Sequence, residues 1–116
     1  MAQEALRIED QPGTQAEQRI VRLHGTLVMT TMFEFQAMVR ADKSRSLIID
    51  FTNVPYVDSA GIGALVGAYV TRQHGGRSLA LVGVSERVHN ALQVTRVEQF
   101  FRFFDSVSAA EAATSA

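Results

Sequence analysis

The sequence contains no cysteine and no tryptophan, and Lys43 is the only lysine among its 11 basic residues. The absence of cysteine excludes a disulfide scaffold, a thiolate nucleophile and any cysteine-ligated zinc or iron–sulfur centre. With 116 residues, 47% of them hydrophobic and a mean hydropathy of +0.04, the chain has the length and composition of one globular domain and is too short for two. We therefore expect a single domain over residues 1–116, with its core over about residues 6–113.

The sequence also lacks an excess of charge of either sign. The 11 basic and 12 acidic residues leave a formal net charge of −1, and neither sign runs in blocks, so nothing indicates a nucleic-acid surface. The first ten residues lack the basic and apolar regions of a secretion signal. The longest uncharged stretch, residues 59–71, is shorter than the roughly 20 apolar residues of a membrane span. We expect a cytoplasmic protein without membrane insertion or nucleic-acid binding.

Motifs for catalysis and cofactor binding are sparse. No Gly-Lys-Ser/Thr sequence exists for a P-loop, and the three histidines, His24, His74 and His89, lack metal-ligand spacing. The segment 59–61 half-matches the G-x-S-x-G nucleophile elbow, but Val57 replaces its first glycine and no signature for a general base surrounds any histidine. We expect no cofactor, no metal and no enzymatic activity. A serine hydrolase would instead act on model esters and lose that activity in Ser59→Ala.

The first half of the chain predicts two strands, a helix and a third strand. Residues 6–9 and 20–24 alternate apolar and polar side chains, which predicts two strands that pair as a hairpin across a polar loop. Thr31 to Glu34 has the S/T-x-x-E form of a capping box, which predicts a helix over about residues 31–42. Leu47 to Phe51 is short and nearly all apolar, as in a central strand covered on both faces.

The second half predicts alternating helices and strands. From Ser59 to His74 the apolar residues recur at helical spacing, and Gly75-Gly76 ends the helix. The remaining elements are a strand over 79–82, a helix begun by Ser85 and carrying Val88, Ala91 and Leu92 on one face, a short strand over 101–103, and a helix begun by a second capping box from Ser108 to Glu111. The order β-β-α-β-α-β-α-β-α predicts an α/β fold with a mixed four- to five-stranded sheet flanked by helices.

The most unusual local chemistry lies at the start of the 59–74 helix. Gly61 and Gly63 stand in its first turns, although each glycine costs a helix roughly 1 kcal/mol relative to alanine. Gly63 and Gly67 would let the helix approach the preceding strand, and Gly61 would leave Ser59 uncrowded. A hydroxyl at a helix N-terminus is accessible to a second protein, and the N–H groups and dipole there favour a phosphate. Ser59 is therefore a candidate phosphoacceptor, although Ser59 or Asp58 could instead be the N-cap.

The string Val57-Asp58-Ser59-Ala60-Gly61-Ile62-Gly63-Ala64-Leu65 resembles the signature of the STAS domain, which bacterial anti-sigma-factor antagonists share with the cytoplasmic tails of sulfate transporters. The resemblance covers roughly Leu6 to Ala113 and implies a STAS-like fold. It implies that a partner, both serine kinase and anti-sigma factor, phosphorylates Ser59, and that the unmodified form binds this partner and frees the sigma factor. Asp58, Ser59, Ala60, Gly61, Ile62 and Gly63 would then contact the partner, together with the exposed side of the helix to His74.

Two positions depart from the family pattern. Phospho-regulated members often carry an acidic residue where this chain has Val28, and the family's Ser-Gly-Leu after the third helix is replaced by Thr95-Arg96-Val97. Val28 keeps open the alternative that the chain is a non-phosphorylated STAS subunit or scaffold of a transporter or stress-signalling complex, with a structural Ser59. In either case we expect a monomer or weak homodimer.

Arginines and phenylalanines form two further groups. Arg72, Arg77, Arg87 and Arg96 are scattered, and we expect them on solvated faces. The segment 100–104 holds four of the seven phenylalanines, and a strand there would place Phe101 and Phe103 on one core-facing side. An exposed Phe100 or Phe104 would indicate a second contact surface or a dimer contact.

Overall fold

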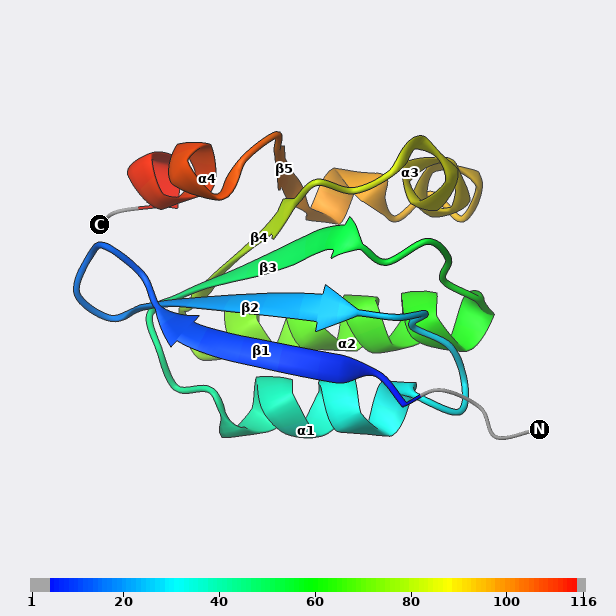
Figure 1. Ribbon diagram of the computed structural model, residues 1–116, viewed down its shortest axis with the longest axis horizontal. Helices are drawn as coiled ribbons and strands as arrows, with labels where there is room; N and C mark the ends of the chain where they lie inside the picture. The colour runs from blue at the N-terminus through cyan, green and yellow to red at the C-terminus, as the bar shows by residue number, and fades with distance from the viewer. Residues whose placement is uncertain (1–4, 115–116) are drawn as a thin grey trace.

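A five-stranded sheet forms the centre of the fold, and the computed structural model describes it within residues 5–114 (Figure 1). The elements are β1 (Arg7–Pro12), β2 (Gln18–His24), α1 (Met32–Ala41), β3 (Ser46–Asn53), α2 (Ser59–His74), β4 (Ser78–Val82), α3 (Glu86–Val94), the 3₁₀ turn η1 (Glu98–Phe100), β5 (Arg102–Phe104) and α4 (Val107–Thr114). The strand order is β1-β2-β3-β4-β5; β1 is antiparallel to β2, and the other neighbours are parallel. The predicted mixed sheet, the hairpin and the order of the four helices and five strands are confirmed.

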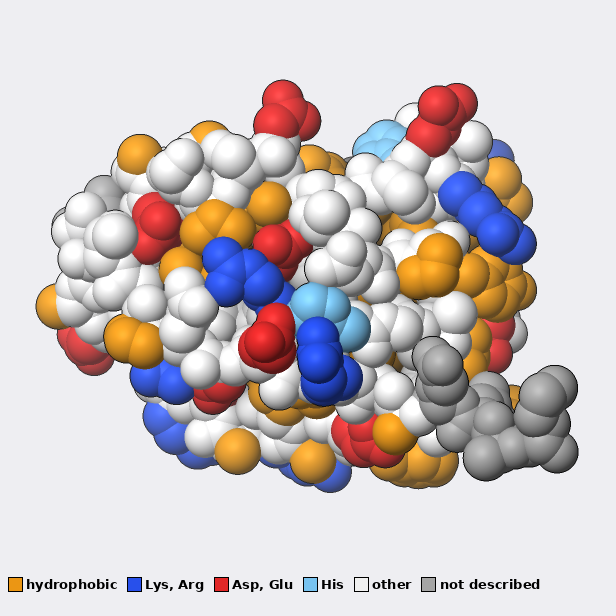
Figure 2. Space-filling model, in the orientation of Figure 1, with side chains coloured by type: hydrophobic (Ala, Val, Ile, Leu, Met, Phe, Trp, Pro, Cys, Tyr) orange, Lys and Arg blue, Asp and Glu red, His pale blue; other side chains and the backbone are white. Residues whose placement is uncertain are grey.

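The alternation of side chains along the strands divides the core into two layers. On β3, Leu47, Ile49 and Phe51 join the larger layer, to which α1, α2 and α3 contribute. Ile48 joins the smaller layer, where Ala110 of α4 packs. Beyond α4 this second face carries charges, such as the ion pair of Asp50 with Arg22 at 3.4 Å, and Figure 2 shows acidic and basic side chains intermingled over β1 and β2. The central position predicted for the 47–51 strand is confirmed.

Two loops at one end of the sheet are tied into a single unit. Leu27, after β2, forms a parallel bridge with Val57, before α2. The Leu27 N–H donates to the Tyr56 carbonyl at 3.1 Å, and the Asp58 N–H donates to the Leu27 carbonyl at 3.3 Å. Leu27 itself is fully buried. The start of α2 is therefore positioned by a loop about 30 residues earlier in the chain as well as by β3.

Both predicted capping boxes are wrong. The Thr31 hydroxyl donates to the Thr26 carbonyl at 2.7 Å and accepts from the Val28 N–H at 3.0 Å, so it holds the preceding turn and does not cap α1. In α4 the Ala109 N–H donates to the hydroxyl of Ser106 and not to that of Ser108, and Glu111 accepts from the Thr14 N–H at 2.7 Å. In both cases tertiary or turn partners compete for side chains that fit the local pattern.

Arg72 is buried, so the prediction of a solvated Arg72 is wrong. It is 1% exposed, and its guanidinium lies 3.4 Å from the Asp42 carboxylate. It also donates to the carbonyl oxygens of Ser44, at 2.8 Å, and Ser78, at 2.9 Å. Burial lowers the pKa of Arg72, and the charge of Asp42 opposes that shift. One planar side chain thus joins the loop after α1, the end of α2 and the start of β4.

Within the part of the chain that the structure describes, no helix is long and apolar enough to cross a membrane.

Candidate functional site

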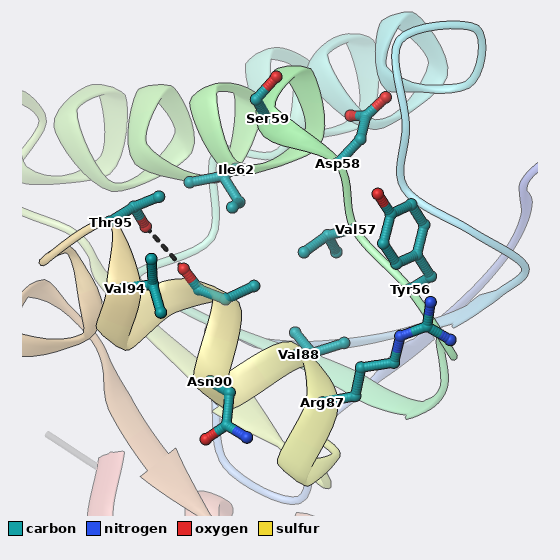
Figure 3. Close-up of a pocket in the computed structure, with 11 residues that line it drawn as sticks. Tyr56, Val57, Asp58, Ser59, Ile62, Arg87, Val88, Asn90, Val94 and Thr95 are labelled. Atoms are coloured by element: carbon teal, nitrogen blue, oxygen red, sulfur yellow. Dashed lines mark hydrogen bonds between the residues drawn. The ribbon is translucent and has the colours of Figure 1, made fainter.

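Ser59 is the first residue of α2, and its side chain is exposed (Figure 3). Within residues 5–114 no group hydrogen bonds to its hydroxyl, and the N–H groups of Ser59 and Ala60 also lack an acceptor, as expected in a first helical turn. The α2 dipole adds positive potential at this end. A hydroxyl and two unpaired backbone donors therefore lie together at the start of α2.

Asp58 is the N-cap of α2, one of the two caps that the sequence predicts. Its Oδ1 accepts from the Gly61 N–H at 2.8 Å, and its Oδ2 accepts from the Met29 N–H at 3.0 Å. One carboxylate therefore closes the first turn of α2 and holds the loop before α1. Ser59 makes no cap bond, so the alternative of a capping Ser59 is wrong.

The glycines of α2 have roles other than those predicted. Gly61 is buried, and a Cβ there would collide with the carbonyl oxygen of Leu27, so this glycine admits the Leu27 backbone. Gly63 and Gly67 are exposed, and a Cβ on either would meet no atom within 4 Å. The predicted close packing of Gly63 and Gly67 on the preceding strand is therefore wrong.

The six residues predicted to contact a partner differ in accessibility. Ser59 and Gly63 are exposed, Asp58 and Ala60 are half-buried, Gly61 is buried, and Ile62 is 9% exposed. Four of the six can therefore be touched directly, whereas Gly61 acts through packing. Ile62 reaches the surface only at the floor of a groove.

Exposed hydrophobic side chains surround the start of α2. Met29, whose N–H bonds to Asp58, is 63% exposed, Phe33 in the first turn of α1 is 64% exposed, and Tyr56 is 40% exposed. The helix itself carries no charged side chain over residues 59–71. Large apolar side chains left exposed together are typical of an interaction surface. The surroundings of Ser59 therefore suit burial against a protein.

An open groove of about 410 Å³ lies between the start of α2 and α3 (Figure 3). Its lining includes Val57, Ile62, Val88, Ala91 and Val94, and Ser59 is part of the same lining. Figure 2 shows hydrophobic side chains gathered at this end of the molecule.

The groove has one prominent cation. The Arg87 guanidinium lies 4.8 Å from the centre of the Tyr56 ring, a cation–π contact that connects α3 to the loop before α2. Sequence reasoning missed this groove, because its walls come from segments about 30 residues apart. The spacing of Val88, Ala91 and Leu92 along α3 was the available signal, and it identified only the buried side of that helix.

The double role of Asp58 can be tested by comparing two caps. We expect Asp58→Ala to destabilise the domain by about 2 kcal/mol, because it removes acceptors from two backbone N–H groups. Ser85→Ala, which removes the single cap bond to Val88 of α3, is expected to cost about 1 kcal/mol. Urea unfolding of both variants checks the difference. Equal losses would show that the bond from Met29 contributes nothing.

Comparisons with known proteins agree on one family. A model described as the STAS domain matches residues 5–110. An anti-sigma-B factor antagonist of Staphylococcus aureus is 30% identical over 78 residues, which cover 65% of this chain and 72% of that protein.

Two solved structures show the same fold. A sulfate transporter family protein from Wolinella succinogenes has a TM-score of 0.77 and 22% identity, over 84% of both chains. The Bacillus anti-sigma factor antagonist SpoIIAA in its unphosphorylated form has a TM-score of 0.72 and 17% identity, over 93% of this chain and 95% of that one.

Proposed function

Because the chain belongs to the STAS domain family, we propose that it is an anti-sigma-factor antagonist that binds an anti-sigma factor with serine kinase activity while Ser59 is unmodified. Phosphorylation of Ser59 then releases this partner. The observation that carries the proposal is the exposed Ser59 hydroxyl at the start of α2, a helix with no charged side chain over residues 59–71, near exposed apolar side chains such as Met29 and Tyr56. The anti-sigma-B antagonist relatives support the partner class, and SpoIIAA, which has also been solved in a phosphorylated form, supports regulation by phosphate.

A phosphate on Ser59 changes binding and leaves the fold in place. It brings about −1.5 to −2 charges at pH 7, and the unpaired N–H groups and dipole of α2 accommodate that charge. A docking protein would have to bury the same charge against apolar surface, which carries a desolvation cost. Asp58, directly beside it, adds a like charge under the same interface. The result is a switch of affinity rather than of shape.

Ser59→Asp is therefore expected to weaken partner binding by at least about tenfold, with a melting temperature within about 2 °C of the wild type. Ser108→Asp is the matched control, since Ser108 is an exposed serine in the first turn of α4. Calorimetric titration of the purified partner into the three proteins measures the affinities. Equal binding by Ser59→Asp and the wild type would contradict the switch.

The partner can be identified by capture from host lysate with wild type and Ser59→Asp side by side. The protein expected on the wild type alone is an anti-sigma factor with a kinase domain. Incubation of that protein with ATP and the wild type should add one phosphate to Ser59, which intact mass and peptide mapping detect. Ser59→Ala should bind the partner and remain unmodified.

We propose that the chain acts by binding and has no catalysis of its own. A serine nucleophile requires a base within hydrogen-bond reach. His24 is instead bonded to Glu9 and Asn53, and the His89 ring packs edge-on against Phe103, 4.9 Å between centres. Hydrolysis of model esters that disappears in Ser59→Ala would contradict this part of the proposal.

The alternative is a non-phosphorylated STAS subunit or scaffold of a transporter or stress-signalling complex. Val28, in place of the acidic residue usual in phospho-regulated members, favours it, and the fold is also shared with a sulfate transporter family protein, with a TM-score of 0.77. Peptide mapping of the protein from its own host distinguishes the two. Phosphate on Ser59 in any growth condition supports the switch, and its absence in all of them supports the scaffold.

A further inference from the structure

Three arginines that are far apart in the sequence meet at the end of the sheet opposite Ser59. Arg45 directly precedes β3, Arg77 directly precedes β4, and Arg102 begins β5. These three strands are adjacent and parallel, so all three begin toward the same end of the sheet. Arg45 and Arg77 are neighbours there, and Arg102 pairs with Ala80, three residues further along than Arg77. Ser59 lies beyond the opposite end of β3, at the start of α2. The fold therefore gathers positive charge at the end where these strands begin, although the chain as a whole carries a net charge of −1.

None of these three guanidinium groups has a carboxylate within 4.0 Å in the part of the chain that the structure describes. Among residues 5–114, Asp42 pairs with Arg72, and Glu111 accepts from the Thr14 N–H. Glu17, whose carbonyl accepts from the Ser46 N–H, forms no ion pair with any of these described residues. Arg72 adds a further positive charge close to Arg77. Burial is the main cause that lowers the pKa of Arg72, and the nearby charge of Arg77 adds to it. An uncompensated cluster of this kind favours an anionic occupant.

The surface between the arginines is hollowed. Two hollows of about 170 and 280 Å³ adjoin there, since both are lined by Ser78 and Arg102, and no carboxylate of residues 5–114 lines either of them. β4 begins at Ser78, two residues before its pairing with β5, which starts at Ala80. At the far side Phe100 is 39% exposed and stacks on Tyr69, with ring centres 5.4 Å apart.

We propose that Arg45, Arg77 and Arg102 bind an acidic segment of a protein partner, whose carboxylates pair with the guanidinium groups and whose apolar side chain covers Phe100. Exposed aromatic rings beside arginines are typical of protein interfaces. Recognition of nucleic acid usually involves about 6–10 phosphate contacts, and recognition of an anionic membrane about 4–8 clustered cations. Three arginines beside an aromatic ring are fewer cations than either of these ligands requires. They fit a short acidic peptide better. This surface is separate from Ser59. The proposal that it binds an acidic segment is therefore independent of the function proposed above.

The test uses the full chain and a fluorescent decapeptide of alternating glutamate and leucine, with the glutamine–leucine peptide as its uncharged control. The glutamate peptide should bind, with affinity that falls as salt rises, and should shift the amide NMR signals of Gly76, Ser78 and Arg102. The triple variant Arg45→Gln, Arg77→Gln, Arg102→Gln should weaken binding by at least about tenfold. Arg7→Gln, Arg40→Gln, Arg96→Gln, which removes the same charge from exposed positions elsewhere, should bind as the wild type does, as should Ser59→Asp.

Several outcomes overturn the proposal. Equal loss in the two triple variants would mean that net charge alone drives binding. Equal binding of the glutamine peptide would remove the role of carboxylates, and shifts confined to the groove beside Ser59 would place the peptide elsewhere. Binding of inorganic phosphate, single-stranded DNA or phosphatidylserine vesicles in preference to the glutamate peptide would assign the surface to another anion.

Discussion

Arg72→Met is expected to destabilise the domain by about 3–5 kcal/mol, the largest loss among the substitutions considered. Methionine fills much of the same volume but donates no hydrogen bond. The Ser44 and Ser78 carbonyls would lose their guanidinium donors, and Asp42 would keep its charge without the facing cation. Each group left unpaired in a buried site costs its desolvation energy. A loss of this size corresponds to a fall in melting temperature of about 10–20 °C for a domain of this length.

The control for Arg72→Met is Arg40→Met, since Arg40 is an exposed arginine in the last turn of α1. It should change stability by less than about 0.5 kcal/mol. Arg72→Lys separates charge from geometry, because lysine keeps the cation and loses the planar fork. An intermediate loss is expected for it. Thermal unfolding followed by circular dichroism measures all three, and an Arg72→Met variant as stable as Arg40→Met would refute the role given to this side chain.

Gly61→Ala is expected to destabilise the domain by about 3 kcal/mol, although alanine is the better helix former. The new methyl group would collide with the Leu27 carbonyl oxygen and lie 2.8 Å from the carbonyl carbon. Leu27 cannot move aside easily, because its N–H bonds to Tyr56, its carbonyl accepts from Asp58, and its side chain is fully buried. Relief of the collision would therefore break the link between the two loops that position Ser59.

Gly67→Ala in the same helix is the matched control, and the opposite sign is expected. A Cβ at Gly67 meets nothing within 4 Å, so the helix gains roughly 0.5–1 kcal/mol from the better residue. Chemical unfolding of the pair isolates the environment of the glycine, since the substitution is identical. If both variants gained stability, the close approach of α2 to Leu27 would be wrong.

Short-range patterns predicted the architecture well. The 59–74 helix was predicted with the bounds that the structure gives, because its apolar spacing and the glycines after it are local signals. The strand over residues 47–51 was identified by its nearly unbroken apolar run. Asp58 and Ser59 were placed correctly at a helix start for the same reason. In each case the residues that decide the structure are neighbours in the chain.

The errors on Arg72 and Gly61 concern residues whose partners are distant in the chain. Arg72 meets Asp42, 30 residues earlier, and Gly61 meets Leu27, so no local pattern shows either contact. A signal for Arg72 was nevertheless present: it follows Leu65 by seven residues and lies on the buried side of α2. The capping boxes failed for local reasons: the Thr31 hydroxyl bonds within the turn before α1, and α4 starts earlier than predicted, with the Ser106 hydroxyl as acceptor. The groove beside Ser59 also required knowledge of how α3 packs.

The two outer strands of the sheet, β1 and β5, influence how this protein aggregates at high concentration. β1 exposes Arg7, Glu9 and Asp10 and ends at a proline, whereas β5 has only three residues. Charges, proline and short length at the margins of a sheet oppose strand-to-strand growth between molecules, the route to amyloid-like aggregates. Self-association at high concentration is therefore expected to use side-chain surfaces and to remain reversible on dilution.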